Sequence, residues 1–534
     1  MPNRGVGLGG GRGAQRVGPP WRPRRQLLAA AAASALVVVT GCTHTTTAGG
    51  GDTTPPGTSP VTTGQVHWRS CSSGASTRCG TIAVPLDYSH PSGRKITLAL
   101  TEVPATAPAS KQQGILLVNP GGPGGSGTGM ASFVSQGLDP SVAAEYDIIG
   151  FDTRGVGASV PALHCDPSFF AKARPNYIPA NKAAEQVLIS RAKAYAAGCQ
   201  KRFGWLLPFM TTQNIARDMD QIRAAMGQSK LSYLGYSYGT YIGQVYATLF
   251  PQRVHRLVLD STVNPKGIWY ADNIGQDYAF QGRAVAFWKW MAGYDRLYHL
   301  GATEAAVRKS WYQARNRLLA HPVKVGGVPL IGGDEFDDTM LVGGYDNGYW
   351  PQMAAALATY LHVGGTQQLT NVYEQVGKQS ENEFAVYNAV ECADVAWPRN
   401  WAKWDSDARR VYVKAPVETW DNVWFNAACD FWPTRGPATP LKVGASGLPG
   451  ILMLQGTGDG ATPYAGAQVA HAQFPTAKMV VVQGGGNHGQ SLAFPANACI
   501  NGYLNRYLDT GALPSGSGPV DATCATLPDP VPSG

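Results

Sequence analysis

The feature that most constrains this 534-residue chain is a Gly-Tyr-Ser-Tyr-Gly turn at positions 235–239. Residues 231–236 have the pattern of a buried strand and residues 241–250 that of a helix, so the turn joins the two directly. Such a tight turn requires almost no side chain two residues before and after the serine, and Gly235 and Gly239 satisfy that requirement. The strain lifts the Ser237 hydroxyl above the sheet edge, where the helix N-terminus favours negative charge. A bare G-x-S-x-G also fits a glycine-rich loop, and the flanking elements favour a nucleophile.

Around this turn the chain alternates between apolar runs and amphipathic segments, as in folds whose helices cover both faces of a parallel sheet. Predicted strands lie at 82–84, 95–103, 114–119, 146–151, 254–260, 450–455 and 478–483, and predicted helices at 212–226 and 464–473. A strand, a serine turn and a helix in this setting are typical of α/β-hydrolases. We therefore predict an α/β-hydrolase fold with a mostly parallel central sheet flanked by helices.

The alternation stops at residue 267 and resumes only near residue 450. The stretch between is helical and aromatic in pattern, and eleven of the 14 tryptophans lie between Trp269 and Trp432. This is the point at which α/β-hydrolases carry a lid, so most of these aromatic side chains are expected to pack the lid's own core. The predicted organisation is a first core segment at 65–266, a helical lid at 267–434, a second core segment at 435–526 and a tail at 527–534.

A second glycine-rich loop, Pro-Gly-Gly-Pro-Gly-Gly-Ser-Gly at 120–127, follows a predicted buried strand. Its G-x-G-x-x-G pattern matches the dinucleotide-binding fingerprint, and Asp152 ends the next strand as a ribose-binding acid would. However, Pro123 removes an N–H from a loop that would have to cradle pyrophosphate, and Asp152 begins a D-x-R-G-x-G-x-S turn common in α/β-hydrolases. We therefore interpret the loop as an oxyanion hole formed by backbone N–H groups of Gly122 and Tyr238. No cofactor is expected.

The catalytic residues are predicted from their order along the chain, which in α/β-hydrolases is nucleophile, acid, histidine. Ser237 is the nucleophile, Asp459 follows the next-to-last predicted strand, and His488 follows the last one in a glycine-rich loop. Ser237 becomes reactive when His488 takes its proton, and Asp459 fixes the imidazole tautomer. His471 and Asp430 are the competing base and acid, but the first falls in a predicted helix and the second in the lid.

The N-terminal residues have the pattern of an export signal. Residues 1–41 contain six arginines and no acid, and a short apolar run leads to Val-Thr-Gly-Cys, which resembles a bacterial lipobox with Cys42 as the lipidated residue. Arg24 and Arg25 also resemble a loose twin-arginine signal, and an ordinary signal peptide is the alternative. Residues 42–64 are rich in Thr, Gly and Pro and predict a flexible tether. The remaining chain has 37 basic and 35 acidic residues, so no nucleic-acid partner is expected, and membrane attachment only through lipid at Cys42.

Without Cys42, eight cysteines remain, an even number that in an exported chain predicts disulfides. Eight cysteines allow 105 pairings. Pairing nearest neighbours in sequence is the simplest hypothesis and gives Cys71–Cys79, Cys165–Cys199, Cys392–Cys429 and Cys499–Cys524. The sequence contains neither C-x-x-C nor H-E-x-x-H, so no metal site is predicted.

Four motifs together resemble one family, the secreted tripeptidyl aminopeptidases, which are relatives of the prolyl aminopeptidases. They are N-P-G-G-P-G-G-S-G at 119–127, G-Y-S-Y-G-T-Y at 235–241, D-G-A-T-P at 459–463 and N-H-G at 487–489. The resemblance covers about residues 65–526 and implies cleavage of short peptides, tripeptides by analogy, from a free N-terminus. Pro120 stands where prolyl aminopeptidases carry a histidine, which argues against strict specificity for a single proline.

In these families, carboxylates of the lid bind the ammonium group of the substrate. The resemblance implies that role for Glu391 and Asp394, which are three residues apart and would share one face of a helix. Glu381 and Glu383 are further candidates, and each of these acids could equally be structural. An esterase or lipase on the same scaffold and a non-enzymatic peptide- or solute-binding lipoprotein are the alternative functions. Acids in the lid favour the peptidase, and an intact triad disfavours the binding protein.

Overall fold

The structure, a computed structural model, describes residues 64–71 and 77–532. The predicted signal segment, Cys42 and nearly all of the tether lie outside the described residues. No helix in the described ranges combines the length and the apolar character needed to cross a bilayer.

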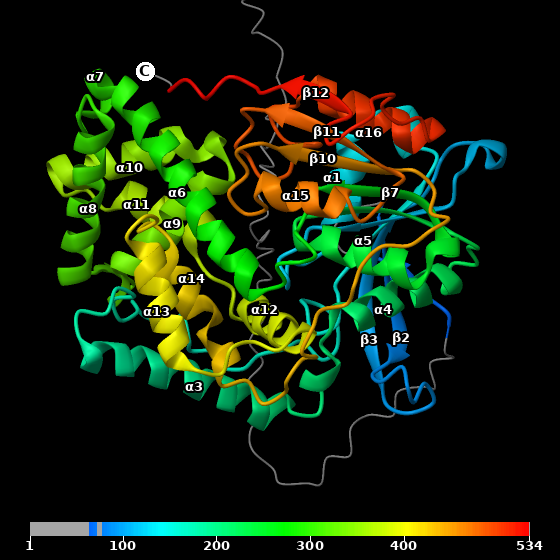
Figure 1. The fold of residues 1–534 in the computed structure, drawn as a ribbon, viewed down its shortest axis with the longest axis horizontal. Helices are drawn as coiled ribbons and strands as arrows, with labels where there is room; N and C mark the ends of the chain where they lie inside the picture. The colour runs from blue at the N-terminus through cyan, green and yellow to red at the C-terminus, as the bar shows by residue number, and fades with distance from the viewer. Residues whose placement is uncertain (1–63, 72–76, 533–534) are drawn as a thin grey trace, which may run out of the picture.

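A ten-stranded sheet forms the centre of the described chain, with strand order β1-β2-β3-β5-β4-β6-β7-β10-β11-β12 (Figure 1). The strands are β1 His67–Ser70, β2 Arg78–Pro85, β3 Lys95–Val103, β4 Ile115–Asn119, β5 Asp147–Phe151, β6 Leu231–Tyr236, β7 Val254–Asp260, β10 Ile451–Gly456, β11 Ala477–Gln483 and β12 Ala522–Ala525. From β5 to β12 every neighbouring pair is parallel, whereas the first strands pair antiparallel. Every residue of β4, β6 and β10 is buried, as expected for strands covered on both faces.

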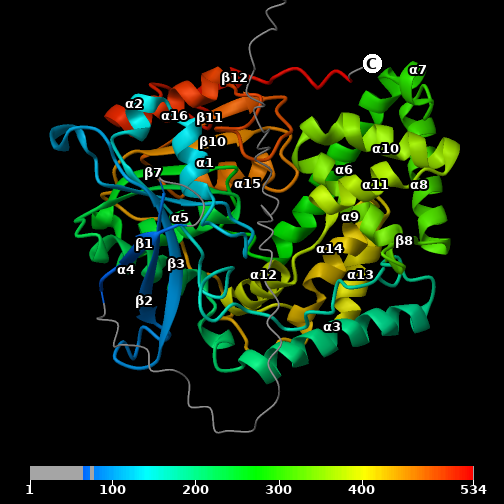
Figure 2. The same cartoon turned by 180° about the vertical axis from the view of Figure 1, so that it is seen from behind.

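Helices cover both faces of this sheet, which gives the α/β-hydrolase fold that the sequence predicts (Figure 2). On one face pack α4 Thr212–Ala225, α5 Tyr238–Leu249 and α15 Tyr464–His471, and on the other α1 Met130–Gly137, the short α2 Pro140–Ala143 and α16 Ala498–Thr510. The apolar face of α4 (Ile215, Met219 and Ile222) is fully buried against the sheet, as its periodicity predicts.

The lid lies beside the carboxyl ends of the strands and has its own hydrophobic core (Figure 1). Its elements are α6 Tyr270–Gly293, α7 Asp295–Tyr298, α8 Glu304–Ala320, β8 Val323–Val325, β9 Val328–Ile331, α9 Gly333–Tyr345, α10 Trp350–Val363, α11 Gln367–Val372, α12 Glu381–Asp394, α13 Trp401–Tyr412 and α14 Thr419–Asn426. Five tryptophans form a continuous stack in the order Trp397, Trp404, Trp401, Trp424, Trp420. The lid tryptophans are thus mostly structural, as their clustering predicts.

A helix from the first core segment also supports the lid. Helix α3, Lys182–Phe203, begins with Asn181, whose side chain accepts a hydrogen bond from the Ala184 N–H. Leu188 and Ala192 of α3 pack with Trp420 and Trp424 of α14, so α3 runs beneath the lid helices (Figure 2). The lid therefore rests on residues that precede it by more than 60 positions.

The structure contains the four predicted disulfides, Cys71–Cys79, Cys165–Cys199, Cys392–Cys429 and Cys499–Cys524. The third joins α12 to the turn after α14, within the lid. The fourth joins α16 to β12, an edge strand that the Pro-, Ser- and Gly-rich composition of the C-terminal region does not predict. Beyond β12 the tail crosses to the lid, where Asp529 accepts a hydrogen bond from the Asn347 side chain at 2.8 Å and the Pro530 carbonyl accepts one from Trp290 at 2.9 Å (Figure 1).

Candidate active site

Ser237 is the single residue between the end of β6 and the start of α5, and it forms the sharp turn that its flanking glycines predict. Its φ of 55° and ψ of −127° lie in a strained region for a non-glycine residue. A side chain on Gly235 would overlap the carbonyl of Gly239, so the turn can close only with glycine there. The Ser237 N–H donates to the Asp260 carbonyl at 3.0 Å, which ties the turn to the end of β7.

His488 and Asp459 come together as the predicted order requires. The Nδ1 atom of His488 lies 3.0 Å from both carboxylate oxygens of Asp459, and both side chains are almost completely buried. Asp459 is itself fixed by the Ala461 and Thr462 N–H groups and the Thr462 hydroxyl. His488 Nε2 is buried without a hydrogen-bond partner in the described part of the chain, so the atom that would accept the serine proton is uncommitted. Asp459 therefore fixes the ring so that Nε2 is the nitrogen left to act as a base, and no hydrogen bond joins Nε2 to Ser237 within the described residues.

Two carboxylates act on the pKa of His488. Burial alone lowers it, but the charge and hydrogen bond of Asp459, with a smaller contribution from Asp260, outweigh burial and raise it above the usual value. Asp260 is fully buried and accepts hydrogen bonds from the Gln490 and Ser491 N–H groups at 2.7 Å. The same residue therefore holds the serine turn through its carbonyl and the histidine loop through its carboxylate.

The predicted oxyanion loop packs directly on the serine turn. A Cβ on Gly121 would lie 2.8 Å from Ser237 Cβ and 2.9 Å from the Tyr238 nitrogen, so only glycine permits this approach. Within the described residues, the Gly122 and Tyr238 N–H groups donate no hydrogen bond, and Gly122 is exposed. Two free donors beside a nucleophile are what an oxyanion hole requires.

Asp152 is occupied in a way that leaves no room for a ribose. One carboxylate oxygen accepts hydrogen bonds from the Ser126 hydroxyl at 2.7 Å and the Gly127 N–H at 2.9 Å, and the other accepts from the Ala158 N–H at 2.8 Å. Its side chain therefore closes the glycine loop internally, and this speaks against the dinucleotide interpretation. Arg154 of the same turn is buried in a two-point ion pair with Asp218.

The competing histidine and acid are engaged elsewhere. His471, at the end of α15, lies 3.1 Å from the Ala477 carbonyl and 3.3 Å from Asp521. Asp430 lies beside the lid disulfide, at the end of the turn that follows α14. Neither belongs to the loops that follow β10 and β11.

Glu391 is buried and Asp394 is half-buried near the end of α12, and they point to different partners. Asp394 accepts hydrogen bonds from Thr212 through both oxygens, at 2.7 Å from the backbone N–H and 2.6 Å from the hydroxyl. We therefore assign Asp394 to the start of α4 rather than to substrate binding. Glu391 lies 3.4 Å from the Asn273 amide and interacts with Tyr387, and burial raises its pKa well above the ordinary range.

Sequence reasoning missed Glu418, a buried acid of the lid at the start of α14. One of its carboxylate oxygens has no hydrogen-bond partner in the described residues, and burial together with neighbouring Asp277 raises its pKa. Tyr345, whose ring meets His488 edge-on at 5.5 Å, is under the electrostatic influence of Glu418, Asp459 and Glu383. The only sign of Glu418 in the sequence was an acid within an aromatic-rich stretch. Its burial could not be predicted, because it depends on how α14 packs against α9.

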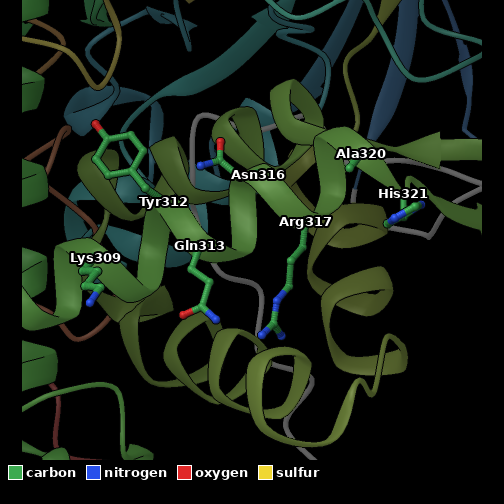
Figure 3. A pocket seen from close by; sticks show the side chains of 7 residues that line it. All are labelled: Lys309, Tyr312, Gln313, Asn316, Arg317, Ala320 and His321. Carbon is green, nitrogen blue, oxygen red and sulfur yellow. The ribbon is translucent and has the colours of Figure 1, made fainter.

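A hollow elsewhere on the lid contributes nothing to this site. Figure 3 shows it along α8, lined by seven residues between Lys309 and His321. None of them belongs to a loop that follows a strand of the central sheet. The hollow therefore shares no residue with the loops at the strand ends.

Comparison with known proteins places the chain in a family. A family model described as an alpha/beta hydrolase fold matches residues 114–288, and one described as a TAP-like protein matches residues 415–524. A tripeptidyl aminopeptidase of Streptomyces coelicolor is 40% identical over 483 residues, which cover 88% of this chain and 87% of that protein. The chain belongs to the tripeptidyl aminopeptidase family of α/β-hydrolases. The family and fold predicted from the four motifs are thereby confirmed.

More distant members of the group carry other names. The serine protease Hip1 of Mycobacterium tuberculosis is 29% identical over 477 residues, covering 84% of this chain and 89% of that protein. Carboxylesterase B of the same species is 29% identical over 495 residues, covering 88% and 91%. As a member of the tripeptidyl aminopeptidase family, the chain is a serine hydrolase that acts as a peptidase.

Proposed function

We propose that this member of the tripeptidyl aminopeptidase family is an exported serine aminopeptidase, anchored by lipid at Cys42, that releases tripeptides from free N-termini. The observation that carries the proposal is the position of the Asp459–His488 pair directly beneath a lid that buries unpaired carboxylates. Cys42 and the signal segment support export through their sequence pattern alone.

In the proposed mechanism, the Ser237 oxygen attacks the scissile carbonyl while His488 Nε2 takes the hydroxyl proton. Asp459 stabilises the resulting imidazolium through Nδ1. The tetrahedral oxyanion accepts hydrogen bonds from the Gly122 and Tyr238 N–H groups. His488 then donates its proton to the leaving amine, the peptide bond breaks, and an acyl-enzyme remains on Ser237. Water, deprotonated by His488, attacks this ester and releases the N-terminal peptide with a free carboxylate.

Specificity for a free N-terminus is assigned to carboxylates of the lid. An α-amino group has a reference pKa of about 7.7–8.0, so much of it is charged near neutral pH, and a buried ammonium is costly without an acidic partner. We assign this partner to Glu418, one of whose carboxylate oxygens has no hydrogen-bond partner in the described residues, with Glu391 as a second buried acid of the lid. Acids with raised pKa values would ionise when the ammonium arrives, so their burial suits a site that is charged only when occupied.

The test compares a free tripeptide amide with the same substrate acetylated at its amino group. Acetylation removes the ammonium, so we expect kcat/KM to fall at least about 100-fold, or some 2.7 kcal/mol. Glu418→Gln should lower kcat/KM for the free tripeptide about tenfold or more and spare a small neutral ester. Glu374→Gln, which changes a lid acid paired with Lys378 at the surface, is the matched control and should change neither.

An esterase is the second candidate, because carboxylesterase B is among the relatives. Equal cleavage of the free and acetylated peptides would refute the aminopeptidase and leave the esterase or an endopeptidase. Loss of fluorophosphonate labelling in Ser237→Ala establishes independently that this serine is the activated one.

A further inference from the structure

The lid contacts the catalytic loops through a segment at the end of α9. The Tyr345 carbonyl accepts a hydrogen bond from the His488 N–H at 2.7 Å. Asn487, next to the histidine, accepts one from the Asn347 N–H at 3.0 Å and donates to the Asn347 side chain at 3.0 Å. The backbone around the catalytic histidine is therefore held by the lid as well as by Asp260. In Figure 1 this end of the lid faces the loops that follow β10 and β11.

Arg283 of α6 lies at the centre of this contact. It is 8% exposed, its Nε donates to the Gly344 carbonyl at 3.1 Å, and its guanidinium lies 5.3 Å from the centre of the Trp350 ring. Its Nη2 atom has no hydrogen-bond partner in the described residues. In the part of the chain that the structure describes, Arg283 has no ion pair. The buried arginines Arg174, in the first core segment, and Arg315, in the lid, are both ion-paired.

Two glycines bring both catalytic loops against this side chain. A Cβ on Gly460, the residue after Asp459, would lie 3.2 Å from Arg283 Cγ and 2.9 Å from the Phe280 ring. A Cβ on Gly486, two residues before His488, would overlap the Arg283 guanidinium. One side chain of the lid thus lies against the loop of the acid and the loop of the base.

We propose that Arg283 is a positioning residue of the catalytic dyad: from the lid it holds the loops of Asp459 and His488 in register and keeps a fixed positive charge beside them. This rests on the proposed triad. The charge favours ionised Asp459 and opposes protonation of His488. The lid, besides covering the substrate, therefore helps to set the pH at which His488 becomes a base.

Other titratable groups lie around Arg283 and the dyad, and all of them stay unchanged in the experiment below. Asp260 at the end of β7 acts on His488, and Asp346 at the end of α9 and Asp529 in the tail act on Arg283. Tyr345, beside His488, is influenced by the lid acids Glu383, Glu418 and Asp421. All of these groups are acids or phenols. Burial lowers the pKa of Arg283, while the charges of Asp459, Asp529 and Asp346 counteract that effect. The surrounding acids therefore stabilise the charged form of Arg283 against the cost of burial.

The test measures the second-order rate of labelling by a neutral fluorophosphonate between pH 5 and 9. The probe carries no ammonium, so the lid acids that would bind a substrate do not enter. Removing the charge in Arg283→Gln should let His488 hold its proton more tightly and move the acid limb of the profile upward by about one pH unit. Arg283→Lys keeps the charge and should leave the limb in place while slowing labelling. Arg315→Gln removes a buried lid charge away from the dyad and should not move the limb.

An unchanged acid limb in Arg283→Gln, with Ser237 still labelled, would overturn the proposal. Absence of serine labelling in the wild-type protein would instead refute the triad itself, so the two failures are distinguishable. If Arg283→Gln does not fold, Gly486→Ala gives a second test, because the new methyl group should displace the guanidinium from the histidine loop. Its acid limb should also move upward, and an unchanged limb would count against the role of Arg283.

Discussion

Asp277 provides a quantitative test of how the buried carboxyl groups of the lid make the stability of the protein depend on pH. Its carboxyl is 3% exposed, accepts a hydrogen bond from the Asn422 amide at 3.0 Å and lies beside Glu418. Burial raises its pKa from 3.8 to about 7, and burial raises the pKa values of Asp272 and Asp394 to about 7 as well. No lysine or arginine forms an ion pair with any of the three in the described residues. The folded chain therefore takes up protons in a pH range in which the unfolded chain is already ionised.

The sign of the effect on stability follows from this difference. A carboxyl whose pKa is raised by folding adds stability at pH values below the unfolded pKa, and that stability is lost as the pH rises through the folded pKa. Lowering the pH from 7.5 to 5.5 protonates Asp277 in the folded protein only, which adds about 2 kcal/mol to the free energy of unfolding. The titrations of Asp272, Asp394 and His488, whose pKa is also raised, act in the same direction. The free enzyme should therefore be more stable at pH 5.5 than at pH 7.5.

Urea denaturation followed by tryptophan fluorescence at the two pH values measures this difference, and urea adds no ions that would screen charge. Asp277→Asn keeps an oxygen to accept the hydrogen bond from Asn422 but cannot titrate. We expect this variant to be more stable than the wild type at pH 7.5 and to gain about 2 kcal/mol less on acidification. Glu374→Gln at the lid surface is the control and should keep the wild-type difference. A wild-type protein that is less stable at pH 5.5, or an unchanged difference in Asp277→Asn, would refute the reasoning.

Three further predictions concern the nucleophile and base, the lid disulfide and the pairing of the cysteines. Ser237→Ala and His488→Ala should each lower kcat by a factor on the order of 10⁴ or more, with urea midpoints close to that of the wild type, and near-normal turnover by either variant would exclude its role. Cys392→Ser with Cys429→Ser should cost about 2–4 kcal/mol of stability, measured in urea, and should raise KM for free tripeptides because α12 carries Glu391 beside Cys392. Non-reducing peptide maps should give the four sequence-neighbour pairs, and crossed pairs would contradict them.

The parts of the fold that sequence could predict are those fixed by local rules. The buried strand at Ile115–Asn119 is a continuous apolar run, and Ser237 is marked by glycines that only a tight turn requires. The order of Asp459 and His488 along the chain predicted the contact that the structure contains between them, because strand order in this fold fixes which loops meet. These features depend on a few residues in a short window or on a topology shared by the whole fold.

The remaining features depend on contacts between distant segments. The Cys499–Cys524 disulfide was predicted, but the strand β12 around Cys524 was not, because its pairing depends on the edge that β11 offers. Asp394 shares α12 with Glu391, so helical spacing predicts a common role, but the approach of Thr212 gives it a different one. Arg283 and Glu418 were not predicted, because an isolated charged residue in a helical stretch looks the same whether it faces solvent or a catalytic loop.

The same lid that covers the proposed active site also contacts the loops that carry Asp459 and His488. The segment that bonds to the His488 backbone, the arginine against both catalytic loops and the acid proposed for the ammonium group all belong to the lid. A displacement of the lid that admitted a peptide would break the Tyr345–His488 hydrogen bond and remove the charge of Arg283 from the dyad. The proposed recognition of the free N-terminus and the positioning of His488 therefore depend on the same part of the chain, so substitutions that loosen the lid should impair both.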